Sequence, residues 1–332
     1  MMPAILRKTD SAEIHAFLEE LHNQDWIRRT ERSWWPQYVF HYTDVKNAIQ
    51  ILTDGKLFCR KALENAGCTF TDSASPDVME AASSEVREYV RLYFRPRTPT
   101  QYRNEGIRPK DQIALNAHCP VPIFFLFDAH DILTRRECEF TNGNFSSSVA
   151  TRGNTAEFLR NLPFEKIYHT GVLPSPPDKV QIIFHRNAEV LIPGHLDLRA
   201  LKVLACRSTA EKDTLLALMS EEIKAQYLSR VRVAPVQLHE KKWTFVEQVV
   251  LSSESIVIHF SPDSETPGPF RAKFELYYLE TGEQDIKEIS EFNVNDVNPF
   301  SFDLTQKPTY YRFRITLDGN LAYENIYSEP SF

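Results

Sequence analysis

The chain has 332 residues, of which 42% are hydrophobic and 25% charged, and its formal net charge is −7. The length favours two folded units, and with a mean hydropathy of −0.37 the composition excludes a disordered chain. The first residues lack the apolar run of a signal peptide and no window approaches the ~20 apolar residues of a membrane span, so we expect a cytoplasmic protein that does not bind membranes.

The N-terminal part of the chain is expected to form a helix, a strand and a second helix. Hydrophobic side chains recur at helical spacing within residues 11–35, which predicts an amphipathic helix. Aromatic and β-branched residues at 38–42 predict a short strand. The second helix should begin after Asp44, which can cap it, and end at Gly55, which can adopt the left-handed conformation that often follows a helix.

The middle of the chain alternates predicted strands with loops. Four segments have strand composition, and the last two should pair across a turn at Arg186-Asn187: 89–94, 122–126, 180–184 and 189–192. The polar segment 141–148 predicts a surface loop. A capping box that begins at Ser208 predicts the helix that closes this unit.

The last part of the chain has a different character. Short strand-like runs at regular spacing, separated by Pro, Gly, Asp and Asn, predict an all-β sandwich of the immunoglobulin-like kind. We therefore divide the chain into residues 1–236 and 237–332. The second segment holds 16 Asp/Glu and 8 Lys/Arg, and the first holds 29 and 30. Because the excess acid lies in the second segment, the first is free to bind phosphates and the second would repel them.

Single residues indicate little chemistry by themselves. Basic side chains between Arg87 and Lys110 alternate with aromatic ones and could hold a dinucleotide or a nucleic-acid strand, although a solvated helix face and a core strand also explain them. Glu189 lies between two apolar runs, where it faces either solvent or a site. His41 on its aromatic strand fits a core position as well as a catalytic one.

Missing motifs exclude several classes of enzyme. The chain has no Rossmann or P-loop glycine motif, no zinc-protease motif and no nucleophile elbow, so any bound dinucleotide must be held by side chains and strand backbone. The cysteines are scattered, which predicts buried free thiols and no metal site: Cys59, Cys68, Cys119, Cys138 and Cys206.

Four segments carry a resemblance to a known family. They are Val-Phe-His-Tyr-Thr-Asp at 39–44 with the helix after it, a Tyr-Phe-x-Pro-Arg-x-Pro signature that ends in Tyr within 90–102, Phe-Thr-Asn-Gly-Asn at 140–144, and Asn-Ala-Glu-Val-Leu-Ile-Pro at 187–193. Taken in this order, they resemble the DarT family of nucleic-acid ADP-ribosyltransferases, over roughly residues 36–200.

The resemblance implies a fold and a set of site residues. The fold would be an α+β ADP-ribosyltransferase fold with a split β core and helices. The catalytic residues would be Glu189, as the carboxylate, and Arg97, which would bind the NAD phosphate and orient the reacting ends. The residues expected to contact NAD are His41, Tyr42, Thr43, Tyr93, Phe94, Arg97 and Tyr102. The residues expected to contact nucleic acid are Thr141, Asn142, Asn144 and Arg152.

The activity implied by the resemblance is transfer of ADP-ribose from NAD to a nucleobase of single-stranded DNA or RNA, without a metal. Such a protein would be a bacterial toxin of a toxin–antitoxin or phage-defence system, and its acidic second domain would bind an antitoxin, a chaperone or a phage trigger. Two departures, Thr100-Gln101 for Met-Leu and Asn142 for Asp, leave the target base open. The alternatives are a protein-modifying ADP-ribosyltransferase and a non-catalytic binding module of the same fold.

Overall fold

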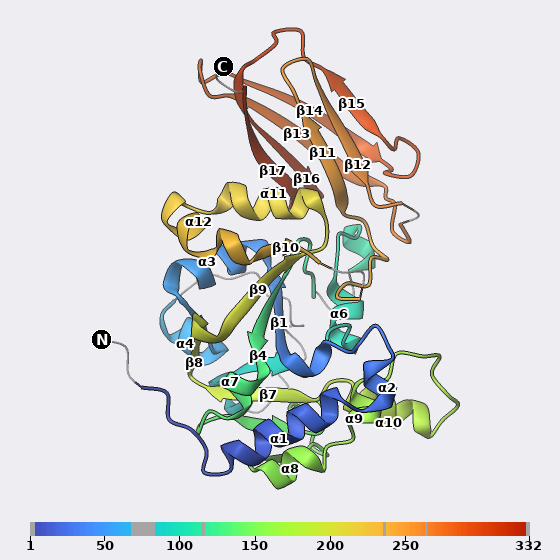
Figure 1. The fold of residues 1–332 in the computed structure, drawn as a ribbon. Helices are drawn as coiled ribbons and strands as arrows, with labels where there is room; N and C mark the ends of the chain where they lie inside the picture. The colour runs from blue at the N-terminus through green and yellow to red at the C-terminus, as the bar shows by residue number, and fades with distance from the viewer. Residues whose placement is uncertain (1–3, 68–83, 114–116, 235–236, 263, 330–332) are drawn as a thin grey trace.

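A computed structural model describes residues 4–67, 84–113, 117–234, 237–262 and 264–329. It consists of a mixed α+β unit followed by an all-β unit, with helix α11 lying between them (Figure 1). The helices are α1 Ser11–His22, α2 Asp25–Arg28, α3 Val45–Asp54, α4 Arg60–Asn65, α6 Pro99–Asn104, α7 Ala129–Leu133, α8 Ala156–Arg160, α9 Phe164–Ile167, α10 Asp178–His185, α11 Thr209–Leu218 and α12 Glu221–Tyr227. None of the described helices combines the length and the apolar composition that a membrane span requires.

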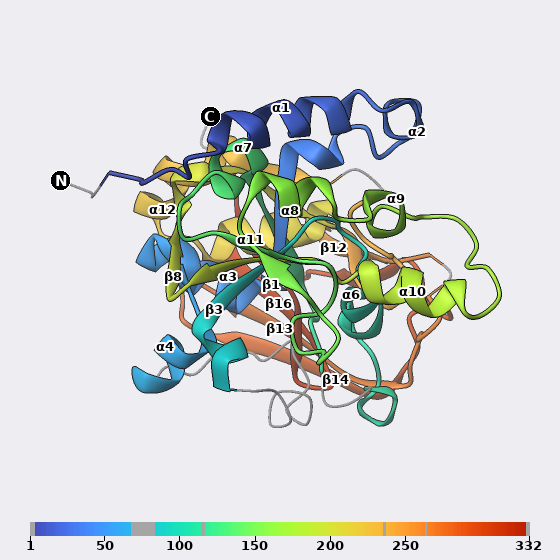
Figure 2. The same ribbon diagram turned by 90° about the horizontal axis from the view of Figure 1, so that it is seen from below.

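The first unit is built on an eight-stranded sheet with the order β10-β9-β4-β1-β3-β7-β5-β6. Its strands, with the short β2–β8 pair beside it, are β1 Tyr38–Asp44, β2 Lys56–Phe58, β3 Tyr89–Tyr93, β4 Pro122–Asp128, β5 Glu139–Thr141, β6 Arg152–Gly153, β7 Glu189–Pro193, β8 His195–Asp197, β9 Leu201–Cys206 and β10 Val231–Val233. β4 is buried along almost its whole length, which explains its continuous apolar run. Helices α1 and α8 lie beside each other (Figure 2), at the end of this unit far from the all-β unit (Figure 1).

The sheet separates into two halves between β1 and β3. β1 pairs with β4 along seven residues and β3 pairs with β7 along five, whereas the register between β1 and β3 in the described chain is the pair Phe40–Tyr93. Because regular pairing between the two strands is limited to this pair, side chains as well as backbone groups connect the halves there, as His41 does through the carbonyl oxygen of Arg91. This seam is the feature of the fold that positions the site.

Several predicted elements are confirmed with their local chemistry. The side chain of Asp44 accepts a hydrogen bond from the amide of Lys46 at the start of α3, and Gly55 ends that helix with a φ of 63°. Ser208 caps α11 by accepting a hydrogen bond from the amide of Glu211. Local side-chain capping and backbone freedom therefore determine these helix ends.

Two predicted elements differ from the structure. Residues 180–184 form part of helix α10 and not a strand paired with β7. Only Ile182 of this helix is buried. An apolar run of this length is too short for its hydrophobic period to distinguish a helix from a strand. The predicted helix 11–35 ends at His22 and is followed by the single turn α2 and a 3-10 turn at Trp35–Gln37.

The second unit contains two antiparallel sheets with the orders β11-β12-β15 and β14-β13-β16-β17. Its strands are β11 Val246–Leu251, β12 Ser255–Phe260, β13 Phe270–Tyr278, β14 Gln284–Phe292, β15 Phe300–Asp303, β16 Tyr310–Leu317 and β17 Asn320–Ser328. Inward-facing residues of both sheets form one hydrophobic core, which confirms an all-β second unit. β17 packs on α11.

Four cysteines are buried free thiols, as predicted: Cys59, Cys119, Cys138 and Cys206. Cys68 lies outside the described residues, as do residues 235 and 236, where the predicted domain boundary falls.

Candidate active site

Glu189 is the first residue of β7 and lies directly opposite Tyr93 of β3, beside the seam. Its carboxylate is almost completely buried, with 1% exposure. A buried carboxylate requires compensating donors because its transfer out of water is costly. The neighbouring strand and loop supply them.

Arg91 is the principal partner of Glu189. It lies two residues before Tyr93 on β3, so both side chains project from the same face of the strand towards Glu189. The guanidinium donates from Nη2 to Oε1 at 2.5 Å and from Nε to Oε2 at 3.1 Å. This two-pronged contact fixes the plane of the carboxylate. Nη2 also donates to Oδ1 of Asn144 at 3.0 Å.

The charges of this pair depend on each other. Burial raises the pKa of Glu189 above its ordinary value, against the opposing effects of Arg91, the Phe145 amide and the Tyr93 hydroxyl. Burial acts to lower the pKa of Arg91, but the carboxylate of Glu189 outweighs it and the net pKa is raised. Arg91 therefore stays protonated and favours the ionised form of Glu189.

The loop after β5 holds Glu189 from a second side. The amide of Phe145 donates to Oε2 of Glu189 at 3.1 Å, and the amide of Glu189 donates to Oγ1 of Thr141 at 2.9 Å. Thr141 is fully buried, unlike the surface position predicted for the start of this loop, because its hydroxyl joins the loop to β7. Asn144 and Phe145 are partly exposed.

His41 lies at the seam on β1. Its Nδ1 is 3.2 Å from the carbonyl oxygen of Arg91, so the ring spans the two halves of the sheet where regular strand pairing stops. Burial lowers the pKa of His41 to about 4, and the ring is therefore neutral at pH 7. A neutral imidazole bonded to a carbonyl donates from Nδ1 and leaves Nε2 as an acceptor.

The other predicted NAD contacts on β1 are held by hydrogen bonds inside the unit. Tyr42 donates to Oδ1 of Asn104 at 2.7 Å, and Thr43 accepts a hydrogen bond from Asn47 at 2.9 Å. Both are largely buried.

Phe94 and Tyr102 have different surroundings. Phe94 is buried in the core against Phe140 and Phe164. Tyr102 on α6 is 42% exposed and its ring makes an edge contact with Trp243. The Tyr102 ring is therefore partly open to solvent, whereas Phe94 is a core residue.

Arg97 lies four residues beyond Tyr93 and has a φ of 55°. This left-handed conformation is uncommon for a residue other than glycine and is often held in place at functional sites. The Arg97 amide donates to Oε1 of Gln101 at 2.7 Å. Its guanidinium donates from Nε and Nη2 to the carbonyl oxygen of His239, at 3.0 and 2.8 Å.

The structure brings Glu189 together with Tyr93, Asn144 and the backbone of the 141–145 loop. The guanidinium that contacts Glu189 is that of Arg91, which sequence reasoning placed in a basic stretch without a role. The sequence did indicate that Arg91 and Tyr93 share one face of a strand. Assigning Glu189 as their partner also required the register between β3 and β7, which the sequence does not give.

The two remaining predicted nucleic-acid contacts are Asn142, which directly follows β5, and Arg152, which begins β6. Asn142 accepts hydrogen bonds from the Thr151 amide at its side chain and from His185 at its carbonyl. Arg152 is 40% exposed and forms ion pairs with Glu85 and Glu139. In the part of the chain that the structure describes, no group of three His, Cys, Asp or Glu side chains could hold a metal ion.

A match to a protein family accounts for this architecture. The family described as ssDNA thymidine ADP-ribosyltransferase, DarT, matches residues 40–245, which is more than half of the chain. The protein is therefore an NAD-dependent ADP-ribosyltransferase. It belongs to the DarT family.

Solved structures of two bacterial proteins are similar to this chain. Thermus sp. 2.9 DarT in complex with ADP-ribosylated ssDNA has a TM-score of 0.46 and 19% identity, covering 60% of this chain and 94% of that one. The same protein in complex with NAD+ has a TM-score of 0.44 at 19% identity, with 60% and 93% covered. Thermosipho africanus DarTG in complex with ADP-ribose has a TM-score of 0.44 and 16% identity, with 61% and 51% covered. None of the curated protein sequences matches this one.

Proposed function

We propose that this protein transfers ADP-ribose from NAD to a nucleobase of single-stranded DNA, with Glu189 as the catalytic carboxylate. The observation that carries the proposal is the buried Glu189 carboxylate beside the seam, oriented through both oxygens by Arg91 and the Phe145 amide. The membership of a family described as ssDNA thymidine ADP-ribosyltransferases supports DNA as the substrate and thymidine as the first base to test.

The reaction breaks the bond between C1′ of the ribose and the nicotinamide nitrogen, and forms a bond between C1′ and a base nitrogen. The transition state has oxocarbenium character, so an ionised carboxylate near the ribose hydroxyls stabilises it. The proton released by the attacking base nitrogen passes to Glu189. Arg91 contributes by keeping this carboxylate ionised and fixed in orientation before NAD binds.

Arg97 is proposed to bind the NAD phosphates. Its guanidinium lies beyond the end of β3, and arginine is well suited to hold a phosphate through two N–H groups. The proposed nicotinamide pocket combines His41, Tyr42, Thr43 and Tyr93 along the seam. Tyr102 is proposed to contact NAD directly, and Phe94 to support the pocket from the core.

The loop from Thr141 to Arg152 is proposed to meet the DNA strand. Asn144 contacts the partner of Glu189 and is partly exposed, so this loop joins the carboxylate to a surface that a base can approach. Thr141 acts through its bond to the Glu189 amide. Asn142 and Arg152 would contact the strand. An unpaired base can enter such a pocket without the cost of leaving a duplex.

The second unit is proposed to be an immunoglobulin-like sandwich that binds a protein. Three strands packed on four, in the orders given above, support this fold. Its 16 acidic and 8 basic residues make DNA an unfavourable partner for this surface and favour a protein. We propose that the chain is a cytoplasmic toxin restrained by an antitoxin, and that its trigger or chaperone binds this unit.

One experiment tests the proposed reaction directly. The full chain is incubated with NAD and single-stranded oligomers of DNA and RNA that each contain one of the four bases, and the products are measured by mass spectrometry. We expect the added mass of one ADP-ribose on thymidine-containing DNA. Modification of RNA alone, or of added protein alone, would contradict the proposal.

A further inference from the structure

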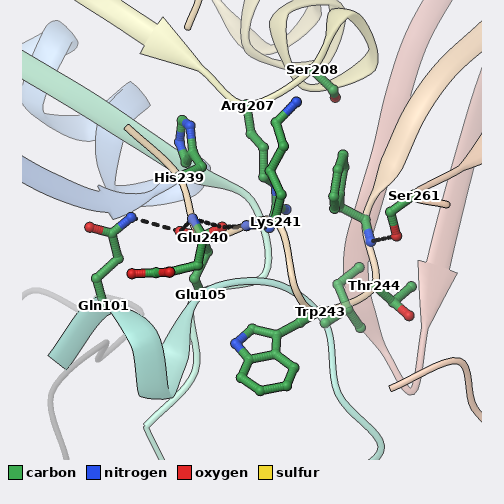
Figure 3. Close-up of polar contacts among 12 residues, drawn as sticks. Gln101, Glu105, Arg207, Ser208, His239, Glu240, Lys241, Trp243, Thr244 and Ser261 are labelled. Atoms are coloured by element: carbon green, nitrogen blue, oxygen red, sulfur yellow. Dashed lines mark hydrogen bonds and ion pairs between the residues drawn. The ribbon is translucent and has the colours of Figure 1, made fainter. Parts of the chain in front are cut away.

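The segment that leads into the second, all-β unit contacts Arg97. Residues 238–244 run across the first unit, and the carbonyl oxygen of His239 accepts both hydrogen bonds from the Arg97 guanidinium. Trp243, in the same segment, donates from its indole nitrogen to the carbonyl oxygen of Tyr102 at 3.1 Å. Two of the proposed NAD contacts, Arg97 and Tyr102, are therefore bonded to this segment. Figure 3 shows His239 and Trp243 within it.

The side chain of Glu105 anchors this segment by binding the segment's backbone amides. The carboxylate accepts hydrogen bonds from the amides of Glu240 and Lys241, each at 3.1 Å. Lys241 has a φ of 56°, and the amides of Glu240 and Lys241 both point at this one carboxylate. The carboxylate thus sets the path of the chain immediately after His239.

Gln101 provides a second link between this segment and Arg97. Its Nε2 donates to the carbonyl oxygen of Leu238 at 2.9 Å and to Oε2 of Glu105 at 2.7 Å, and its Oε1 accepts the Arg97 amide. One side chain therefore contacts the segment, its anchor and the backbone of Arg97. Figure 3 shows the side-chain amide of Gln101 turned towards Glu105 and the segment that contains His239 and Glu240.

Glu105 is suited to this position because it is buried and ionised. Its exposure is 0%, and Arg207, also fully buried, lies 3.4 Å away. Burial acts to raise the pKa of Glu105, but the surrounding charges and donors hold its net pKa below the ordinary value. Arg207 also pairs with Glu211, which is buried. The Glu211 carboxylate accepts hydrogen bonds from the backbone and side chain of Arg207, and its amide donates to Ser208.

We propose that Glu105 is a positioning residue for NAD: by binding the amides of Glu240 and Lys241 it holds the His239 carbonyl against Arg97, so that the segment before the β-domain is part of the NAD site. This inference rests on the proposed role of Arg97. It assigns to residues 238–241 a function within the reaction besides that of a connection between two domains.

The test measures nicotinamide release by the full chain as a function of NAD concentration. Glu105→Gln should raise the KM for NAD about threefold to tenfold and change kcat by less than about twofold, because a phosphate contact made equally in substrate and transition state affects binding alone. Loss of folded protein would instead lower kcat and leave KM unchanged. Circular dichroism verifies the fold of each variant.

Glu211→Gln is the matched control. It removes the charge of the second carboxylate that pairs with Arg207, and Glu211 makes no contact with the amides of Glu240 and Lys241 in the described structure. It should leave the KM for NAD unchanged. In an Arg97→Ala background, Glu105→Gln should have no further effect on KM, within about twofold, because the two act through one contact. An equal KM increase in that background, or a fall in kcat alone, would overturn the inference.

Arg97→Ala by itself separates this inference from the proposed function. It should raise the KM for NAD at least about tenfold. An unchanged KM for NAD in Arg97→Ala would contradict the proposed role of Arg97. A raised KM in Arg97→Ala together with a wild-type KM in Glu105→Gln would contradict the role of Glu105 alone. If Glu105→Gln does not fold, Gln101→Leu replaces it, with the same expected increase in KM, and an unchanged KM would again overturn the inference.

Discussion

Arg91 contacts both carboxylate oxygens of Glu189. It lies on β3 two residues before Tyr93, which faces Glu189 across the pair of strands. This relationship gives the buried carboxylate a fixed orientation and a counter-charge before substrate binds. Arg91 retains 22% side-chain exposure while Glu189 has 1%, so the arginine is the member of the pair that reaches solvent.

Replacing Arg91 should change the pH dependence of the reaction. Activity requires ionised Glu189, so it falls as pH drops through the pKa of this group, which burial already raises. Arg91→Met removes the charge that opposes burial, and the acid limb of kcat/KM should move about one to three pH units higher. Tyr93, the other titratable group on this face, keeps its hydrogen bond to the carboxylate.

Two further variants support this measurement. Arg91→Lys keeps the positive charge and should move the acid limb less than Arg91→Met. Arg28→Met, an exposed arginine on α2, should leave the profile unchanged. An Arg91→Met enzyme with the wild-type pH profile would show that Arg91 does not control the ionisation of Glu189.

Arg207 should be essential for stability. It is fully buried between Glu105 and Glu211 and also donates to the carbonyl oxygen of Pro120. Arg207→Met leaves two buried carboxylates without their shared cation, and should lower the free energy of unfolding by about 3–5 kcal/mol. Urea unfolding followed by circular dichroism measures this. A loss below about 1 kcal/mol would contradict the described ion pairs.

The ring of His239 should be dispensable although its carbonyl is not. Both ring nitrogens are buried without a hydrogen-bond partner among the described residues, and the ring packs on Phe124. Burial lowers the pKa of His239 to about 3, so the ring is neutral. His239→Phe keeps the carbonyl and removes unpaired polar atoms, so stability should stay equal or rise by about 1 kcal/mol. The KM for NAD should not change; an increase of tenfold would assign a role to the imidazole.

The sequence predicted the elements whose signals are local. The cap at Asp44, the glycine at 55 and the buried apolar run of β4 each act within a few residues, and each is present in the structure. Residues 180–184 show the limit of such signals, because a short apolar run carries no period that separates a strand from a helix.

The partners of the site residues depended on pairing that no local pattern contains. Arg91 reaches Glu189 because β3 and β7 pair in one particular register, across almost a hundred residues of chain. The contact of Arg97 with His239 spans a still longer separation and depends on a buried network around Glu105. The sequence therefore indicated which residues are candidates for the site, but it did not indicate which residues they contact.

The most direct test of the account is nicotinamide release by Glu189→Gln in the presence of NAD and a thymidine-containing single-stranded DNA. The substitution keeps the size of the side chain and removes its charge, so kcat should fall by about 100- to 1,000-fold while the fold is retained. Glu137→Gln, an exposed glutamate of the same unit, is the matched control and should behave as wild type. Equal rates for Glu189→Gln and the wild-type enzyme would contradict the assignment of Glu189 as the catalytic carboxylate.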